Sequence, residues 1–409
     1  MRPLRALVVA HTASAAGNAA TQVAVPLHVL ATGGSGLQLG IASAAAVVPV
    51  VVGGVFGGTV VDRVGYRRTS IAGDVVGAVT IAAVPLLAGT VGLPFWGLVL
   101  LLVATGLLDA PGQAARHAML PEVCAADGVP LLKATGALNG AERLAQLLGV
   151  AATAALVGWL GALPVLWLDA ATFAASATLV LLAVPHTSTA PSPAGAYLRR
   201  LREGFDVVRR DGLLRAVVLL VLATNAFDTG LSVLLPLVAR DTWHHPAAFG
   251  WVSAVFGAGA AVGALQAHRL TRRWSRRRVF ALSFLLAGAP RCLLLATGPS
   301  LELTVVVFLA CGLAAGAINP VLGAVQLERV APRMRARVAG LVAAGAWAGM
   351  PAGSLLAGWG ADRVGVVPVL WTVGVLYLLV TLAPFAGRSW GDMDRPARQD
   401  ADREVDVAG

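Results

Sequence analysis

Residues 163–184 read LPVLWLDAATFAASATLVLLAV, and this stretch contains a single charged side chain, Asp169. A helix needs roughly 20 consecutive apolar residues to cross the hydrocarbon core of a bilayer. Eleven other stretches of similar length and character occupy most of the 409-residue chain. Charged residues make up only 13% of the sequence, about half their usual share in a soluble domain. The sequence therefore predicts an all-α membrane protein with twelve transmembrane helices.

Short polar connectors separate the predicted spans, which cover 6–31, 37–61, 69–91, 94–118, 136–160, 163–184, 214–239, 248–268, 278–297, 302–327, 337–360 and 366–387. The longest interruption follows the sixth span and divides the chain into two halves of six. We therefore expect an N-terminal six-helix bundle at 1–185, a cytoplasmic linker at 186–213, a C-terminal six-helix bundle at 214–388 and a disordered cytoplasmic tail at 389–409.

The linker carries an amphipathic pattern after a run of Pro, Ser and Thr. Leu198, Leu201, Phe205 and Val208 fall near one helical face, and arginines surround them. This pattern is typical of a helix that lies in the membrane interface. A charged and partly disordered linker is the alternative.

The positions of the basic residues predict how the chain is oriented in the membrane. All Lys and Arg except four lie at the N-terminus, in every second connector, or in the C-terminal tail, and the exceptions are Arg143, Arg240, Arg291 and Arg363. Loops rich in Lys and Arg stay on the cytoplasmic side. The pattern places both termini in the cytoplasm of a cell whose inner membrane holds the protein. The net charge of +10 then indicates contact with anionic lipid and not with nucleic acid.

An eight-residue motif occurs twice. Residues 58–65 read GTVVDRVG after the second span, and residues 358–365 read GWGADRVG after the eleventh. The charge pattern places the two copies on opposite faces of the membrane, as an inverted repeat would. The spacing has a physical use in the first copy, because Gly58 permits close helix approach, Asp62 can cap a helix N-terminus and Gly65 allows a tight turn.

The first copy and the basic residues after it resemble the signature of the major facilitator superfamily between helices 2 and 3, carried by Gly58, Asp62, Arg63, Gly65, Arg67 and Arg68. The segment from Arg116 to Val123, followed by Asn139, is similar to the enterobactin and macrolide efflux subgroup of drug:proton antiporters. The resemblance implies two bundles with pseudo-two-fold symmetry around a central cavity. It also implies that helices 1, 4, 7 and 10 line this cavity and that the signature acts as a conformational switch.

Charged side chains inside the spans are the first candidates for function, because a charge at mid-bilayer costs ~2.5–3.5 kcal/mol even on the lenient insertion scale. Asp228 and Asp109 are the two proton-coupling candidates, and Asp228→Asn is expected to abolish coupled transport. Asp228 has the alternative of a hydrogen bond between helices. The family resemblance gives Asp109 another alternative, a latch that receives Arg67.

The remaining intramembrane charges have weaker assignments. Asp169 is expected to be structural, and Asp74 to join the charge network of the signature. Glu142 and Arg143 can satisfy each other or neighbouring loops, and Arg291 needs an anion that the sequence does not name.

Polar side chains without charge are the candidates for the substrate cavity, and they are Asn18, Gln22, Asn225, Asn319 and Trp347. Asn18 and Gln22 are four residues apart and hence share one helical face. Hydrogen bonds between helices are the alternative role. His11, near the cytoplasmic end of the first span, is expected at the membrane interface.

The sequence favours a secondary active transporter that exports a small amphipathic molecule by proton antiport. The chain contains no phosphate-binding loop of the G-x-x-x-x-G-K-[ST] type and no recognisable catalytic motif, so neither ATP hydrolysis nor enzyme activity is predicted. We expect a monomer with no cofactor, disulfide or bound metal, whose partners are the small-molecule substrate, protons and membrane lipid. An uptake permease or facilitator is the alternative, and a non-transporting membrane sensor is a remote one.

Overall fold

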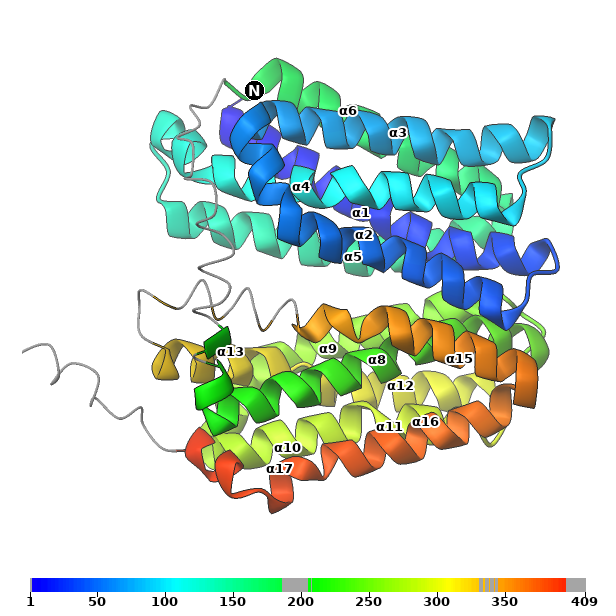
Figure 1. Cartoon of the computed structure of the whole chain (residues 1–409), viewed down its shortest axis with the longest axis vertical. Helices are drawn as coiled ribbons and strands as arrows, with labels where there is room; N and C mark the ends of the chain where they lie inside the picture. The colour runs from blue at the N-terminus through cyan, green and yellow to red at the C-terminus, as the bar shows by residue number, and fades with distance from the viewer. Residues whose placement is uncertain are drawn as a thin grey trace, which may run out of the picture. The chain divides into compact units, whose positions relative to one another are not determined.

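The computed structural model describes residues 2–185, 208–330 and 345–394, together with 205, 206, 334, 338 and 342. The side chains of 54–60, 62, 63 and 388 lie outside this description. All regular structure in the described ranges is helical (Figure 1). Most of the predicted linker and residues 395–409 of the predicted tail are outside the described residues, so the expected interfacial helix stays a prediction.

Six long helices form the first part of the chain, and they are α1 (Pro3–Ala31), α2 (Gly36–Val64), α3 (Tyr66–Thr90), α4 (Phe95–Asp127), α5 (Leu131–Leu160) and α6 (Ala162–Ala183). Helix α3 packs against α4 and α6, and α1 packs against α5 and α6. Leu7, Met119, Val123 and Leu138 are among the buried apolar side chains that join α1, α4 and α5.

The second part contains more and shorter helices, namely α8 (Gly212–Asp241), α9 (Ala248–Arg273), α10 (Arg276–Ala287), α11 (Ala289–Leu295), α12 (Leu301–Ala315), α13 (Ile318–Arg329), α15 (Met350–Val364), α16 (Val366–Thr381), α17 (Ala383–Ala386) and the 3₁₀ helix η2 (Arg388–Met393). The predicted ninth span is broken between α10 and α11. Pro290 causes this break, because a proline has no amide hydrogen and clashes with the preceding turn. The predicted tenth span is likewise broken between α12 and α13, just before Asn319 and Pro320.

Ten helical segments of the described chain are long and apolar enough to cross a membrane. They include α10 with α11, α12 with α13, and α16 with α17, each counted as one segment, and they do not include α1 or α15. The protein is therefore a multi-pass, all-helical membrane protein.

The chain forms two compact units. Unit 1 contains α1–α6 together with Ser232–Ala254 and Ser354–Val364, which are parts of α8, α9 and α15. Unit 2 contains the other parts of those three helices, the helices α10–α13, α16 and α17, and η2.

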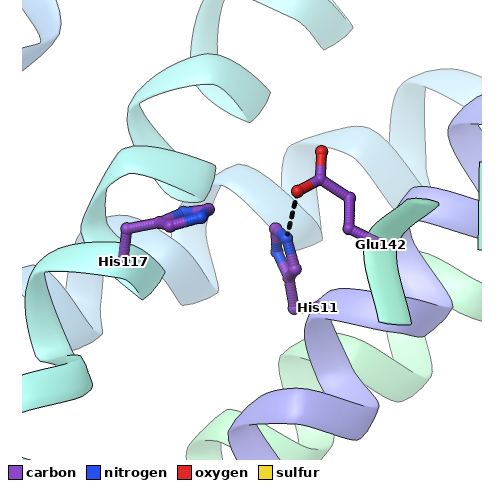
Figure 2. Close-up of side chains that lie close together, drawn as sticks. All are labelled: His11, His117 and Glu142. Carbon is purple, nitrogen blue, oxygen red and sulfur yellow. Dashed lines mark hydrogen bonds and ion pairs between the residues drawn. The ribbon is translucent and has the colours of Figure 1, made fainter. Parts of the chain in front are cut away.

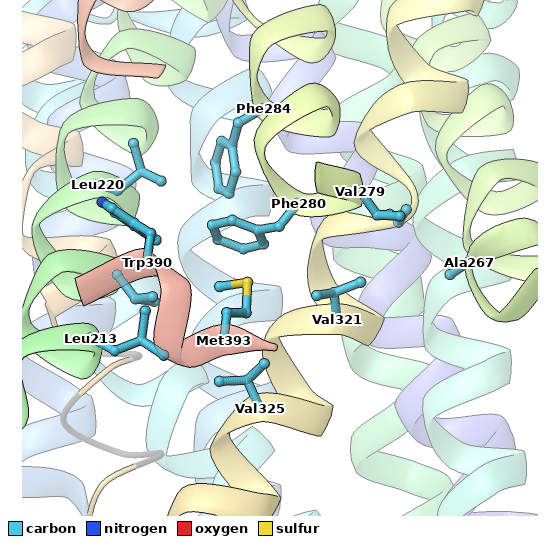
Figure 3. Close-up of a cluster of buried hydrophobic side chains, with 12 residues drawn as sticks. Leu213, Leu220, Ala267, Val279, Phe280, Phe284, Val321, Val325, Trp390 and Met393 are labelled. Atoms are coloured by element: carbon cyan, nitrogen blue, oxygen red, sulfur yellow. The ribbon is translucent and has the colours of Figure 1, made fainter. Parts of the chain in front are cut away.

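The core of unit 2 extends beyond the predicted start of the tail at 389. Trp390 and Met393 are 4% and 1% exposed, and they pack beside Phe280, Leu213 and Val325 (Figure 3). The ring centroids of Phe280 and Trp390 are 5.9 Å apart. Burial of this apolar surface explains why the helical structure continues to Met393.

Candidate functional site

A buried arginine lies at the centre of unit 1. The side chain of Arg116 is 0% exposed, and its Nη1 donates to both carboxylate oxygens of Asp74, at 2.8 and 2.9 Å. Its Nη2 donates to Ser14 Oγ at 3.2 Å and lies 3.9 Å from Oδ1 of Asp109. Ser176 Oγ donates to Asp74 at 2.7 Å. Side chains from α1, α3, α4 and α6 therefore meet at one guanidinium, and we name Asp74, Asp109 and Arg116 the unit 1 charge cluster.

Asp109 is the less tightly held acid of the unit 1 charge cluster. Its Oδ2 accepts hydrogen bonds from Asn18 at 3.0 Å and from Gln113 at 2.7 Å. Its Oδ1 is buried and receives no hydrogen bond from the described residues. Asp109, Gln113 and Arg116 occur at i, i+4 and i+7 of α4, so helical periodicity places them on one face. Two carboxylates thus share one guanidinium, and one of them has an oxygen that receives no hydrogen bond from the part of the chain that the structure describes.

This arrangement corrects one interpretation of the sequence and differs from another. Arg116 had been assigned to a cytoplasmic connector, but α4 continues to Asp127 and buries it. The alternative latch between Asp109 and Arg67 is not formed here, because Arg67 donates to the carbonyl oxygen of Leu181 and Asp109 contacts Asn18, Gln113 and Arg116.

Asp169 joins helices α1 and α6. Its carboxylate accepts a hydrogen bond from Thr21 of α1, and Thr172 donates to its backbone carbonyl at 2.7 Å. A side chain at Gly17 would come within 2.1 Å of Asp169 Oδ1, so the close helix approach needs glycine there. These contacts agree with the structural role expected for Asp169.

Unit 2 contains an ion pair between two charges that the sequence had singled out separately. Arg291 Nη2 donates to Asp228 Oδ1 at 2.6 Å, which supplies the anion that Arg291 needs. Tyr377 Oη lies 3.4 Å from both carboxylate oxygens. The guanidinium also lies over the ring of Phe256, 4.2 Å from its centroid, in a cation–π arrangement.

The break before α11 positions this pair. Arg291 Nε donates at 2.6 Å to the carbonyl of Ala287, so the guanidinium satisfies a backbone group at the helix break. A side chain at Gly288 would come within 1.9 Å of the Tyr377 ring, so glycine makes room for this tyrosine. The side chain of Asp228 remains 41% exposed, whereas that of Arg291 is 8% exposed. The pair is therefore balanced in charge and accessible at its acidic end.

The predicted cavity residues divide into two groups. Asn18 contacts Asp109, and Asn225 donates to the carbonyl of Ala346 at 2.9 Å, so both make interhelical hydrogen bonds. Gln22, Asn319 and Trp347 are exposed. Asn18 and Asn225 therefore fit the alternative role of hydrogen bonding between helices. The three exposed side chains remain candidates for contact with a substrate.

The two copies of the repeated motif end their helices in the same way. Gly65 follows α2 with φ +93°, and Gly365 follows α15 with φ +90°, a conformation that glycine adopts without strain. Among the other residues of the first copy, the side chains of Asp62 and Arg63 and the surroundings of Gly58 lie outside the described residues. Arg68 is exposed at the start of α3.

The second copy makes a contact within unit 1 that we name the Asp362 cap. The carboxylate of Asp362 accepts hydrogen bonds from the backbone N–H groups of Gly36 at 2.7 Å and Leu37 at 2.9 Å, at the N-terminus of α2. A side chain at Gly358 would come within 2.2 Å of the Gly36 carbonyl oxygen. The helix dipole favours a negative charge at this position. In this second copy the glycine allows close helix approach and the aspartate caps a helix N-terminus. These are the roles that the sequence suggested for Gly58 and Asp62 of the first copy.

Comparison with known proteins finds efflux proteins that align with nearly the whole chain. The chain is 29% identical to the multidrug efflux pump Tap of Mycolicibacterium fortuitum over 385 residues, which cover 92% of this chain and 94% of that protein. It is 30% identical over 402 residues to the protein of the same name from Mycobacterium tuberculosis, covering 94% of each. Macrolide efflux protein A of Streptococcus pyogenes is 22% identical over 372 residues, covering 89% and 91%.

Solved structures and family models settle the fold. The nucleoside transporter NupG superposes with a TM-score of 0.79 at 14% identity, covering 94% of this chain and 99% of that one, which shows a shared fold only. The model of the Major Facilitator Superfamily matches residues 7–242 and 217–404. With helices throughout the described chain and relatives that are membrane pumps, this protein belongs to the Major Facilitator Superfamily and is a transporter, not an enzyme.

Proposed function

We propose that this protein exports small amphipathic molecules, such as drugs or antibiotics, across the cytoplasmic membrane in exchange for protons. Two observations on the relatives support export: each is named an efflux pump or an efflux protein, and each aligns over about nine-tenths of both chains. The proton is proposed from the unit 1 charge cluster and not from the comparisons.

The observation that carries the proton assignment is the charge count at Arg116. One guanidinium faces two buried carboxylates, and its distance to Asp74 is 2.8 Å but to Asp109 is 3.9 Å. A surplus charge in a buried site is costly, and neutralisation is the usual escape. A proton on Asp109 removes the surplus negative charge. It can bind at Oδ1 of Asp109, which receives no hydrogen bond from the described residues. Exposure of the cluster to water would release this proton again.

The proposed architecture has twelve crossings in two six-helix bundles. Helices α1 and α15 supply the two crossings beyond the ten that length and hydropathy identify. An even number keeps both termini in the cytoplasm, in agreement with the positions of the arginines. We propose bundle boundaries at 1–185 and 214–393, with the second end moved from 388 because Trp390 and Met393 belong to that core, and we propose that the protein acts as a monomer in contact with anionic lipid.

We propose that the two motif copies stabilise opposite states of an alternating-access cycle. The Asp362 cap holds α15 against the N-terminus of α2 in the present conformation. Gly58, Asp62, Arg63, Gly65, Arg67 and Arg68 form the corresponding switch on the other face. Gln22, Asn319 and Trp347 then contact substrate, while Asn18 connects the cavity to Asp109.

The proton gradient provides enough energy for this exchange. One elementary charge that crosses ~150 mV releases ~3.5 kcal/mol, from ~2.3 kcal/mol per 100 mV. This amount supports a few-hundred-fold substrate gradient, at about 1.4 kcal/mol for each factor of ten. A single carboxylate that carries one proton per cycle is therefore sufficient.

The test uses purified protein in liposomes with an acidic lumen. The wild type should accumulate a fluorescent drug in the lumen only while the pH gradient persists. Asp109→Asn should lose this accumulation but keep downhill drug flux, because the asparagine is neutral throughout the cycle.

Asp169→Asn is the matched control, because Asp169 is a buried acid of the same unit whose hydrogen-bond partners among the described residues are threonines and not arginines. It should retain gradient-driven accumulation. Full accumulation by Asp109→Asn would contradict the proton assignment, and the absence of drug flux in the wild type would contradict the transport of drugs.

A further inference from the structure

Two histidines and a glutamate from three helices meet within unit 1. His11 of α1, His117 of α4 and Glu142 of α5 point toward one another (Figure 2). His11 Nε2 lies 3.3 Å from Glu142 Oε2, and the two imidazole ring centroids are 5.1 Å apart. One potential ligand atom from each residue lies within 4.8 Å of the others. These residues are far apart in the sequence, so their spacing gave no indication of a site.

The burial of His11 differs from the sequence expectation of an interface side chain. It is 1% exposed, and its Nδ1 is buried without a hydrogen-bond partner among the described residues. Buried polar atoms normally have a partner, so the described residues satisfy this imidazole only at Nε2, the nitrogen that faces Glu142. His117 is exposed, which leaves the cluster open to solvent from one side.

The neighbours of the cluster orient its side chains. His117 Nδ1 lies 3.1 Å from the carbonyl oxygen of Gln113, so a proton on Nδ1 leaves Nε2 with a free lone pair. Gln146 Nε2 donates to Glu142 Oε1 at 3.3 Å, which leaves Oε2 facing His11. Hydrogen bonds of this kind fix the tautomer and orientation of metal ligands in known sites.

The donor set is that of a zinc-type ion. Two imidazoles and one carboxylate form a known three-ligand set for Zn²⁺, with bonds of about 2.0–2.2 Å and a fourth position for water. In tetrahedral geometry such bonds place neighbouring ligand atoms about 3.3 Å apart. The distance between His11 and Glu142 already has this value, and small side-chain rotations would bring His117 into range.

We propose that His11, His117 and Glu142 form a binding site for a divalent transition-metal ion with a preference for Zn²⁺-like coordination. The ion joins α1, α4 and α5, and a water molecule completes its coordination. The site is separate from Asp109, but Gln113 contacts both, through its side chain to Asp109 and its carbonyl to His117.

This connection gives the site a regulatory role, which rests on the proposed function. A bound dication places positive charge one helical turn from Gln113 and disfavours a proton on Asp109. Zn²⁺ should therefore inhibit proton-driven transport of the wild type and leave downhill flux less affected.

The binding test needs no transport. Purified, chelator-washed protein is titrated with Co²⁺, whose visible absorption reports tetrahedral coordination, and with Zn²⁺ in competition. We expect one ion per chain and a metal-dependent rise in melting temperature. His11→Gln, His117→Gln and Glu142→Gln should each weaken binding by at least about tenfold, the loss that removal of even an outer-shell partner can cause.

Two further variants make the outcome decisive. His28→Gln changes another buried histidine of α1 outside the cluster and should bind Co²⁺ as the wild type does. His117→Cys changes the exposed ligand and should keep the ion while adding a thiolate–Co²⁺ absorption band. Absence of saturable binding by the wild type, or unchanged binding by the three ligand variants, would overturn the site. Binding of Zn²⁺ without inhibition would support the site and contradict its regulatory role.

Discussion

Each unit holds a buried arginine against carboxylates, but the two arrangements differ in charge and in access to solvent. In unit 1 the 0%-exposed Arg116 faces Asp74 and Asp109, which are 1% and 8% exposed. In unit 2 the 8%-exposed Arg291 faces Asp228, which is 41% exposed. The unit 1 charge cluster therefore contains one carboxylate more than Arg116 can neutralise, whereas the pair in unit 2 is balanced. The first arrangement suits a proton carrier, and the second suits a connection between helices.

The largest expected effect comes from removal of the two arginines. Arg116→Gln leaves two enclosed carboxylates without a cation, and loss of one partner of a buried ion pair costs about 3–5 kcal/mol. Arg291→Gln leaves Asp228, which solvent reaches, so its cost should be smaller. Thermal unfolding of both purified variants in one detergent measures the difference.

Arg116→Lys serves as the control for charge alone, because a lysine cannot make the two-pronged contact with Asp74. It should recover part of the stability but not all of it. Equal losses for Arg116→Gln and Arg291→Gln would show that the two arrangements are energetically equivalent and that the surplus charge at Arg116 has no cost.

The second prediction separates the two roles of Asp228. Asp228→Asn strands the guanidinium of Arg291, with a cost of about 1.5–3 kcal/mol for a lost hydrogen bond between charged groups. Its gradient-driven transport should therefore fall through lost stability, whereas the role as proton carrier predicts that coupled transport is abolished. The double variant Asp228→Asn with Arg291→Gln removes both charges and should restore much of the stability and the gradient-driven transport. A stable double variant that transports drug only downhill would instead identify Asp228 as a proton carrier.

Hydropathy and arginine position predicted the class of the molecule because both are local properties of the sequence. Helices α1–α6 overlap the first six predicted spans, although α4 continues past 118 to Asp127 and α5 begins at Leu131 and not at 136, and the expected turn at Gly65 is present. The breaks before α11 and α13 were not predicted, because uniform hydropathy conceals the effect of Pro290 on the helix.

The candidate site was only partly predictable because its members meet across helices. Asp109, Asp228 and Arg291 were recognisable as charges in apolar stretches, but the pairing of Asp228 with Arg291 crosses 63 residues of sequence. Arg116 was assigned to the cytoplasm because the positive-inside pattern treats every arginine near a span end as exposed. The i, i+4, i+7 spacing from Asp109 was the available signal that it continues the buried face of α4.

The third prediction concerns the Asp362 cap and is smaller. Asp362→Asn removes the negative charge at the N-terminus of α2, and helix capping contributes about 1 kcal/mol. Amide hydrogen exchange at Gly36 and Leu37 should accelerate about fivefold, the factor that corresponds to 1 kcal/mol. Ser35→Ala is the control, because Ser35 caps the same helix through Gln38. Unchanged exchange in Asp362→Asn would show that Ser35 alone secures this helix end.

The smallest expected effect is that of Tyr377→Phe in unit 2. The tyrosine hydroxyl lies 3.4 Å from both oxygens of Asp228, a long contact beside the 2.6 Å bond from Arg291. The phenylalanine ring keeps the space opposite Gly288 and the contact with Phe227, so only the hydroxyl is lost. We expect a loss of about 0.5 kcal/mol, the low end of the range for one hydrogen bond because the contact is long, and no change in coupling. A double-mutant cycle of Tyr377→Phe with Asp228→Asn measures the interaction directly. A coupling energy as large as that between Asp228 and Arg291 would mean that the tyrosine hydroxyl stabilises this carboxylate as strongly as the guanidinium does. The site in unit 2 would then be a three-residue cluster and not a simple ion pair, and its contrast with the unit 1 charge cluster would be weaker.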